Sequence, residues 1–222
     1  YETGRKPSNV TGMPRMFYDH SKPFSKAVKF YNFAIPEKII QKPAAYIIPQ
    51  GWHAVIQLLQ ANAVQYKTLE KDSVIEVNAY RIDDYKTSTR AYEKHYRHSD
   101  VKTSTRLQKI TFRKGDLIIP TGQAADRFLV ETLEPTGDDG YFAWNFFDAI
   151  LQQKEGYSNY RWEDVAGDFL ASHPEIKQQL EDKKKAEPAF AASANAQLDF
   201  VYKKYPWYEP AHLRYPIYRL EK

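Results

Sequence analysis

The feature that most constrains the fold is a short apolar run with turn-forming residues at both ends. The run is Leu117–Pro120, which follows a Gly-Asp turn and precedes a Thr-Gly pair. Four residues are too few for a helix, so the run predicts a buried strand. Residues 121–132 then carry apolar side chains at spacings of three and four, which predicts an amphipathic helix that stops before Pro135.

A second group of apolar residues follows the turn at 135–140. Its spacing predicts another helix, whose large side chains are Phe142, Trp144, Phe146, Phe147, Ile150 and Leu151. A single exposed helix cannot hide this much aromatic surface, so we expect another part of the protein to cover it.

The first half of the chain contains a similar apolar run at Tyr46–Pro49. Gln50 and Gly51 follow it and open a predicted amphipathic helix, whose apolar face consists of Trp52, Val55, Ile56, Leu59 and Ala63. A short strand is expected at 65–69. Strand, helix and strand together predict a right-handed crossover between parallel strands.

Residues 73–112 change to an alternation of period two, which predicts two long antiparallel strands joined by a loop rich in Tyr and His. Three helices are expected over 161–172, 175–185 and 194–205, followed by a Pro- and Tyr-rich tail at 208–220. The predicted fold is therefore α/β. It has a mixed, partly parallel sheet with an antiparallel excursion and flanking helices, and a helical C-terminal segment that wraps the sheet.

The N-terminal region has a different composition. Residues 1–42 are expected to form an extended arm and an edge hairpin, with two short strands in 28–40 around Pro36. We interpret this region as a connector from an upstream domain, and 43–222 as the α/β domain. The first residue is Tyr1, and the chain has the character of a piece of a longer protein.

Composition excludes several classes of function. The chain has no cysteine, which excludes disulfides, thiolate zinc sites and a cysteine nucleophile. Its net charge of +4 comes from interspersed Lys, Arg, Asp and Glu, so no nucleic-acid partner is expected. No apolar run is long enough to predict a membrane span. The 17 Tyr and 4 Trp suit a large packed interface or a surface that faces peptide or saccharide, but an aromatic core is the simpler explanation.

Motifs for catalysis are missing from the sequence. None of the six histidines has the spacing of a zinc site, and the only close pair is His95 and His98. No Gly-x-Ser-x-Gly, Walker or dinucleotide-binding motif occurs. We therefore expect no catalytic residue, no metal site and no cofactor in this chain.

One binding site is expected from the predicted parallel sheet. If the two apolar runs are parallel, the helices that follow them begin at the same sheet edge, where small anionic or polar ligands bind. The candidate residues are Trp52, His53 and Gln123. The alternative is that Trp52 packs in the core while His53 and Gln123 only cap helices and contact solvent.

The order of several short motifs resembles a known family. These are a Leu-Glu-Pro and a Trp-x-Phe-Phe within Gly115–Tyr157, the segment Pro43–Trp52, a Leu-Asp-Phe-x-Tyr within Ala196–Tyr202, and a Tyr-Pro within Tyr215–Arg219. In this order they resemble the region C-terminal to the catalytic domain in bacterial zinc carboxypeptidases of the carboxypeptidase A type. The resemblance extends over nearly the whole chain from Lys42 onward.

The resemblance implies a non-catalytic accessory domain that packs on the upstream peptidase domain of the same polypeptide. Zinc is then expected in that upstream domain, because none of the family's zinc ligands or catalytic residues maps onto this chain. The family's C-terminal region is similar to a class I glutamine amidotransferase-like domain, but the absence of cysteine excludes that activity. The implied location is periplasmic or secreted. The alternative is an independent module that binds peptide, glycan or a cell-wall fragment through exposed Tyr and Trp.

Overall fold

The computed structural model describes residues 1–221, which divide into two compact units after Ile39. The sequence placed a boundary nearby, after Lys42. The first unit holds a two-stranded sheet, and the second holds a six-stranded sheet together with the helices.

The first unit begins with an antiparallel hairpin. Its strands are β1 (Glu2–Pro7) and β2 (Pro14–Asp19). The Phe17 ring lies over Gly4, where an added Cβ would come within 2.7 Å of it, so glycine is needed for this contact. The Lys6 ammonium lies 4.8 Å from the centroid of the same ring, which adds a cation–π contact to the hairpin.

Residues 23–43 form neither helix nor strand, so the strands predicted in 28–40 are wrong. Alternating apolar residues do not form a strand without a neighbour to pair with, and Pro36 removes one amide donor. Residues 24–39, which we call the apolar connector, are exposed throughout. Its large exposed apolar side chains are Phe24, Val28, Phe30, Tyr31, Phe33, Ile35 and Ile39.

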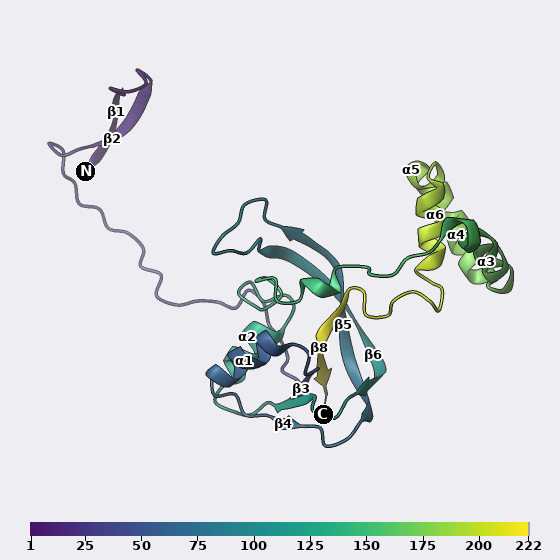
Figure 1. Cartoon of the computed structure of the whole chain (residues 1–222). Coiled ribbons are helices and arrows are strands. Elements are labelled where there is room, and N and C mark those ends of the chain that lie inside the picture. The colour runs from purple at the N-terminus through teal and green to yellow at the C-terminus, as the bar shows by residue number, and fades with distance from the viewer. Residues whose placement is uncertain (222) are drawn as a thin grey trace. The chain divides into compact units, whose positions relative to one another are not determined.

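The second unit is built on a sheet with the strand order β4-β7-β3-β8-β5-β6 (Figure 1). The strands are β3 (Ala45–Ile48), β4 (Lys67–Thr68), β5 (Ser73–Thr87), β6 (His98–Phe112), β7 (Leu117–Pro120) and β8 (Arg214–Leu220). All of its pairings are antiparallel. The mixed α/β class, the long antiparallel excursion of β5 and β6 and the helical C-terminal segment are confirmed.

The predicted parallel pairing of the two apolar runs is wrong. Ile48 lies opposite Leu117 and Ala45 lies opposite Pro120, so β3 and β7 run in opposite directions. Both runs are apolar and four residues long, and such strands carry no side-chain pattern that favours one direction. β3 and β4 do run in the same direction, because each is antiparallel to β7, but β7 lies between them.

Strand β8 occupies the middle of the sheet, where the sequence predicted only a tail. It pairs with β3 on one side and β5 on the other. Pro216 is unusual in a central strand, because proline cannot donate to the ladder. The structure accommodates it where the β5 pairing is irregular, between the Ala79–Tyr218 and Arg81–Arg214 pairs.

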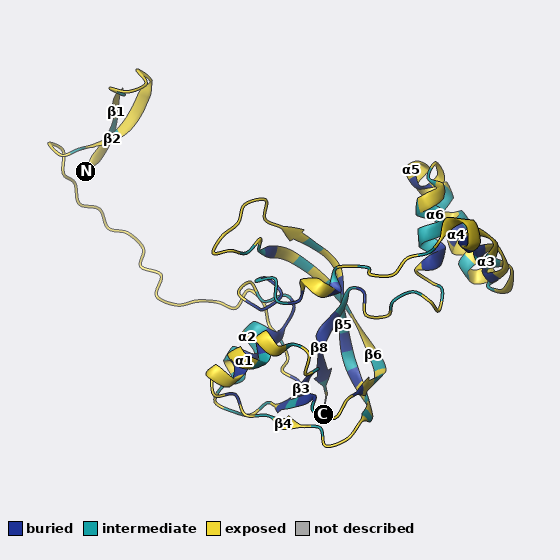
Figure 2. Ribbon diagram, in the orientation of Figure 1, coloured by how far each residue is buried: buried dark blue, intermediate teal, exposed yellow. Residues whose placement is uncertain are grey.

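Two helices, α1 (His53–Ala61) and α2 (Asp126–Leu133), contribute to the main core. Tyr46 and Ile48 of β3 share this core with Leu59 and Leu129 of the helices. Ile47 lies in a different cluster, together with side chains of β5, β6 and β8. Successive residues of β3 therefore serve the two faces of the sheet, and both faces are buried there (Figure 2).

The aromatic segment after α2 is not the helix that the spacing predicted. Residues 141–147 form consecutive turns, and only Asp148–Ile150 make a short 3-10 helix, η1. Asn145 has a φ of 66°, which interrupts a right-handed helix. The expectation that the aromatic side chains need cover is confirmed, since Phe142 and Phe147 are fully buried.

The C-terminal helices are α3 (Asn159–Ser172), α4 (Pro174–Ala186), α5 (Pro188–Ala191) and α6 (Ala194–Tyr202). They share a core of their own around Trp162, separate from the two sheet clusters. Their buried sides face one another (Figure 2). The expectation that they wrap the sheet is therefore not met, because the apolar sides of these helices pack against one another.

A charged pair lies buried where α2 ends against the sheet. Glu134 Oε1 accepts hydrogen bonds from the Tyr46 hydroxyl at 2.8 Å and from Arg219 Nη1 at 2.9 Å. Arg219 also donates to the Tyr80 hydroxyl and to the Gln41 carbonyl. Burial and then the Glu134 charge raise the pKa of Tyr46 above its usual value, so its hydroxyl stays a donor.

His212, which lies just before β8, makes stability depend on pH. Its ring interacts with the Tyr208 hydroxyl and lies 3.3 Å from the Leu151 carbonyl. Burial lowers the pKa of His212 below the ordinary 6.5, so the unfolded chain binds the proton more readily. This stability is present above pH 6.5 and is lost as the pH falls through the lowered pKa.

We therefore expect His212→Gln to flatten the pH dependence of the free energy of unfolding below neutrality. Urea unfolding at a series of pH values measures this. His53→Gln is the control, because His53 is exposed and its loss leaves the slope unchanged. A His212→Gln protein with the wild-type slope contradicts the assignment.

Candidate binding site

The predicted site residues do not form one site. Trp52 and His53 lie at the start of α1, which follows β3, whereas Gln123 follows β7. Because β3 and β7 are antiparallel neighbours, the carboxyl end of β3 lies beside the amino end of β7, and the two carboxyl ends point in opposite directions. Trp52 packs edge-on against Phe147 with ring centroids 4.9 Å apart, while His53 is exposed.

Gln123 has a structural role. Its Nε2 donates to the carbonyls of Pro120 and Gln65, at 2.7 and 3.0 Å. Its Oε1 accepts from the Gln65 amide at 2.8 Å. The side chain therefore joins the end of β7 to the segment before β4, and all of its hydrogen bonds are to backbone.

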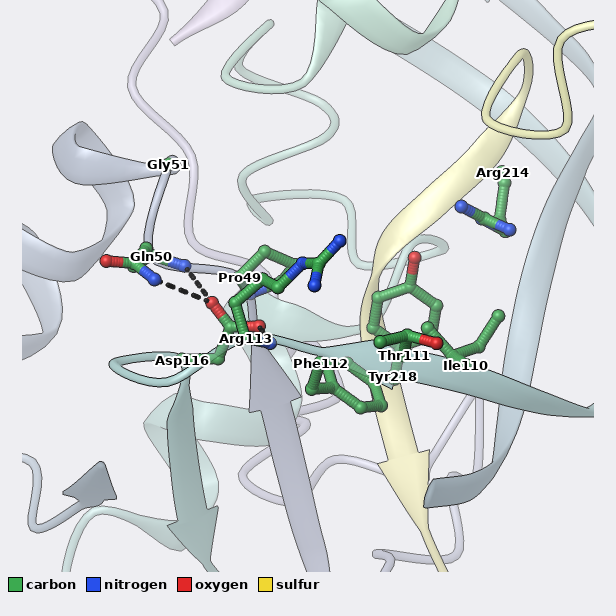
Figure 3. A pocket seen from close by; sticks show the side chains of 10 residues that line it. All are labelled: Pro49, Gln50, Gly51, Ile110, Thr111, Phe112, Arg113, Asp116, Arg214 and Tyr218. Atoms are coloured by element: carbon green, nitrogen blue, oxygen red, sulfur yellow. Dashed lines mark hydrogen bonds between the residues drawn. The ribbon is translucent and has the colours of Figure 1, made fainter. Parts of the chain in front are cut away.

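A pocket does open beside the turn that joins β3 to α1. Its cavity volume is about 330 Å³. Its lining comes from that turn, from the end of β6 and the turn after it, and from β8 (Figure 3). The lining residues are Pro49, Gln50, Gly51, Ile110, Thr111, Phe112, Arg113, Asp116, Arg214 and Tyr218.

Asp116 fixes one wall of this pocket. It is buried, and its carboxylate accepts from the backbone amides of Gln50 at 3.0 Å and Arg113 at 2.7 Å. The Gln50 side chain packs over Gly115 and donates to the Lys114 carbonyl at 2.8 Å. Gly115 has a φ of 96°, a conformation that favours glycine. The two turns are thus tied together and preformed.

Two arginines supply positive charge to the pocket. Arg113 is exposed and forms an ion pair with Asp72, with Nη1 and Oδ2 2.7 Å apart. Arg214 is half-buried and forms no ion pair with any residue in 1–221. In Figure 3 both guanidinium groups and the Tyr218 hydroxyl project into the same space.

The floor of the pocket is aromatic. The Phe112 and Tyr218 rings meet edge-to-face with centroids 5.1 Å apart, and both side chains are buried. Burial raises the pKa of Tyr218, with the Arg214 charge acting in the opposite direction. Tyr218 therefore remains a hydroxyl donor at neutral pH. A pocket with guanidinium and phenol donors above an apolar floor is suited to binding an anion that carries an apolar group.

A second polar cluster, around His98, is structural. Its Nδ1 lies 3.0 Å from the Thr87 hydroxyl and its Nε2 lies 3.0 Å from Asp148 Oδ1. The order hydroxyl, imidazole, carboxylate is the order of a catalytic triad. However, the ring is buried between Tyr85 and Phe142, so it ties the loop end of the β5–β6 hairpin to the aromatic segment.

Within the described residues 1–221, no group of three or more His, Asp or Glu side chains is placed to hold a metal ion. No helix in that part of the chain is both long and apolar enough to cross a membrane. No family model, curated protein or solved structure is significantly similar to this chain.

Proposed function

We propose that this chain is the non-catalytic accessory region of a periplasmic or secreted zinc carboxypeptidase. Its partner is the upstream peptidase domain of the same polypeptide, which holds the zinc ion and cleaves the peptide. The accessory region docks on that domain through the apolar connector, residues 24–39. The motif resemblance and the surface of the connector support this proposal.

The observation that carries the docking step is the exposure of the connector. Phe30, Phe33 and Ile35 are 85%, 75% and 80% exposed, although each belongs to a residue type that is usually buried. Several exposed apolar side chains in one short segment are typical of a site where another protein surface docks. The connector contains no regular hydrogen-bonded structure, so it can adapt its backbone to a partner.

The sequence of the natural gene upstream of Tyr1 provides a first test. We expect it to encode a His-x-x-Glu pair, a later histidine and a general-base glutamate. An open reading frame that begins with a signal peptide directly before Tyr1 contradicts the proposal. It would leave the alternative, a free-standing module that binds peptide or glycan.

Limited proteolysis of the whole polypeptide tests the docking step. We expect the connector to be cut slowly in the full-length protein, because the peptidase domain covers it. Changing Phe30, Phe33 and Ile35 together to serine is expected to speed cleavage there about tenfold or more.

The matched control changes three exposed apolar residues outside the connector, Val74, Leu107 and Tyr160, to serine. This control also replaces three exposed apolar side chains but leaves the docking segment intact, so its cleavage rate should equal that of the wild type. A connector that is cut as fast in the full-length protein as in the isolated chain shows that nothing covers it.

A further inference from the structure

We propose that the pocket between the β3–α1 turn, β6 and β8 binds a small carboxylate that carries an apolar group. Arg214 is the main anion-binding residue and Arg113 assists it. This inference is independent of the docking of the connector, since it uses different residues in a different unit of the chain.

The charges in the pocket are unbalanced. Its lining holds two arginines and one carboxylate, that of Asp116. Asp116 faces backbone amides and the Gln50 side chain, so its oxygens are already occupied. Arg214 is left half-buried without a counter-ion among residues 1–221. A partly desolvated guanidinium gains more from an anion than an exposed one does.

Arg113 is a weaker contributor for a structural reason. Its side chain is 69% exposed and already shares the Asp72 carboxylate. Exposed ion pairs of this kind contribute little free energy. Some of the N–H donors of Arg113 can therefore turn from Asp72 to a ligand with little loss of stability. Arg214 belongs to β8 and Arg113 to the turn after β6, and both line the pocket, so a bound carboxylate can be approached from two elements (Figure 3).

The apolar floor determines what the anion carries. The Phe112 ring, the Tyr218 ring and the Ile110 side chain line the pocket below the donors. A bare anion would contact only the donors, whereas an aliphatic or aromatic group on the ligand would also contact the apolar part of the lining. The volume of about 330 Å³ is at the small end for ligand pockets and fits one amino-acid-sized group.

A planar carboxylate fits the two guanidinium forks. Phosphate also accepts hydrogen bonds from arginine, so the experiment must separate the two anions. The probes are therefore N-acetyl-L-leucine, its uncharged amide N-acetyl-L-leucinamide, and inorganic phosphate. Each is titrated into the purified chain and followed by heteronuclear NMR, with shifts mapped onto the amides of Gly51, Thr111 and Arg214.

We expect N-acetyl-L-leucine to shift these amides in a saturable way, and the amide and phosphate to bind at least about tenfold more weakly. Arg214→Gln is expected to weaken binding of the acid about tenfold or more, and Arg113→Gln to weaken it less. Arg106→Gln removes the same charge from an exposed position of β6 outside the pocket and should leave binding unchanged.

Several results would overturn the proposal. Equal binding of the acid and its amide would show that charge is not recognised. Unchanged binding by Arg214→Gln would remove Arg214 from the site, and tighter binding of phosphate would reject a carboxylate ligand. If Arg214→Gln does not fold, Arg214→Lys replaces it. Lysine keeps the charge but not the fork, so weaker binding with an unchanged fold is expected.

Discussion

Replacing Arg219 by methionine is expected to lower the free energy of unfolding by about 3–5 kcal/mol. Arg219 is 8% exposed and Glu134 is 2% exposed, and their side chains form a hydrogen-bonded ion pair at 2.9 Å. Methionine is close to arginine in length but leaves the Glu134 carboxylate charged and buried. The Tyr46 hydroxyl still donates to that oxygen, but no positive charge then faces it. Urea unfolding at neutral pH measures the change.

The double variant Arg219→Met/Glu134→Leu tests the cause of this loss. Removing both charges leaves no uncompensated ion, so the double variant should be more stable than Arg219→Met alone. Arg106→Met is the matched control at an exposed strand position and should change stability by no more than about 0.5 kcal/mol. A double variant that is less stable than Arg219→Met would show that packing, and not the buried charge, dominates.

Local sequence patterns predicted the existence and type of several helices and strands. The apolar runs at β3 and β7, the helices α1 and α3 and the long β5–β6 hairpin were found because turn residues and periodicity are local signals. The direction of β3 against β7 could not be found in this way. It depends on pairing between segments about 70 residues apart, and an unbroken apolar run has the same appearance in either direction.

Strand β8 shows a second limit. The sequence predicted a tail here, because the segment is rich in proline and tyrosine. Its insertion between β3 and β5 is a tertiary effect, stabilised by full burial of Tyr215 and Ile217. The available signal was the apolar and aromatic content of 215–218, which suits a buried strand and outweighs one proline at an irregular pairing.

The candidate pocket could not be predicted from the sequence, because it too depends on the placement of β8 in the sheet. Arg113 and Arg214 are far apart in sequence, and they line one pocket only because β8 lies next to β5 in the sheet. The sequence did point to the turn after β3, and Gln50 and Gly51 do line the pocket. The expectation that Gln123 lies beside this turn assumed parallel strands, whereas β3 and β7 are antiparallel.

Because the helical segment has a core of its own, Trp162→Ala is expected to unfold α3–α6 while the sheet remains folded. Trp162 is 2% exposed, packs against Tyr202 and Tyr205, and donates from Nε1 to the Leu198 carbonyl at 3.2 Å. Truncating a buried tryptophan to alanine costs about 3–5 kcal/mol, which is a large part of the stability of so small a group of helices. Hydrogen exchange followed by mass spectrometry measures the loss of protection in each segment.

The reciprocal variant is Phe142→Ala, which opens a cavity in the sheet core and leaves the Trp162 cluster intact. We expect it to reduce protection in β3 and β8 first, because these strands contribute to the damaged core. If instead either variant removes protection from the sheet and the helices together, the two cores unfold as one cooperative unit. Separate losses would mean that residues 159–202 can open without disturbing the pocket, since no residue of that range lines it.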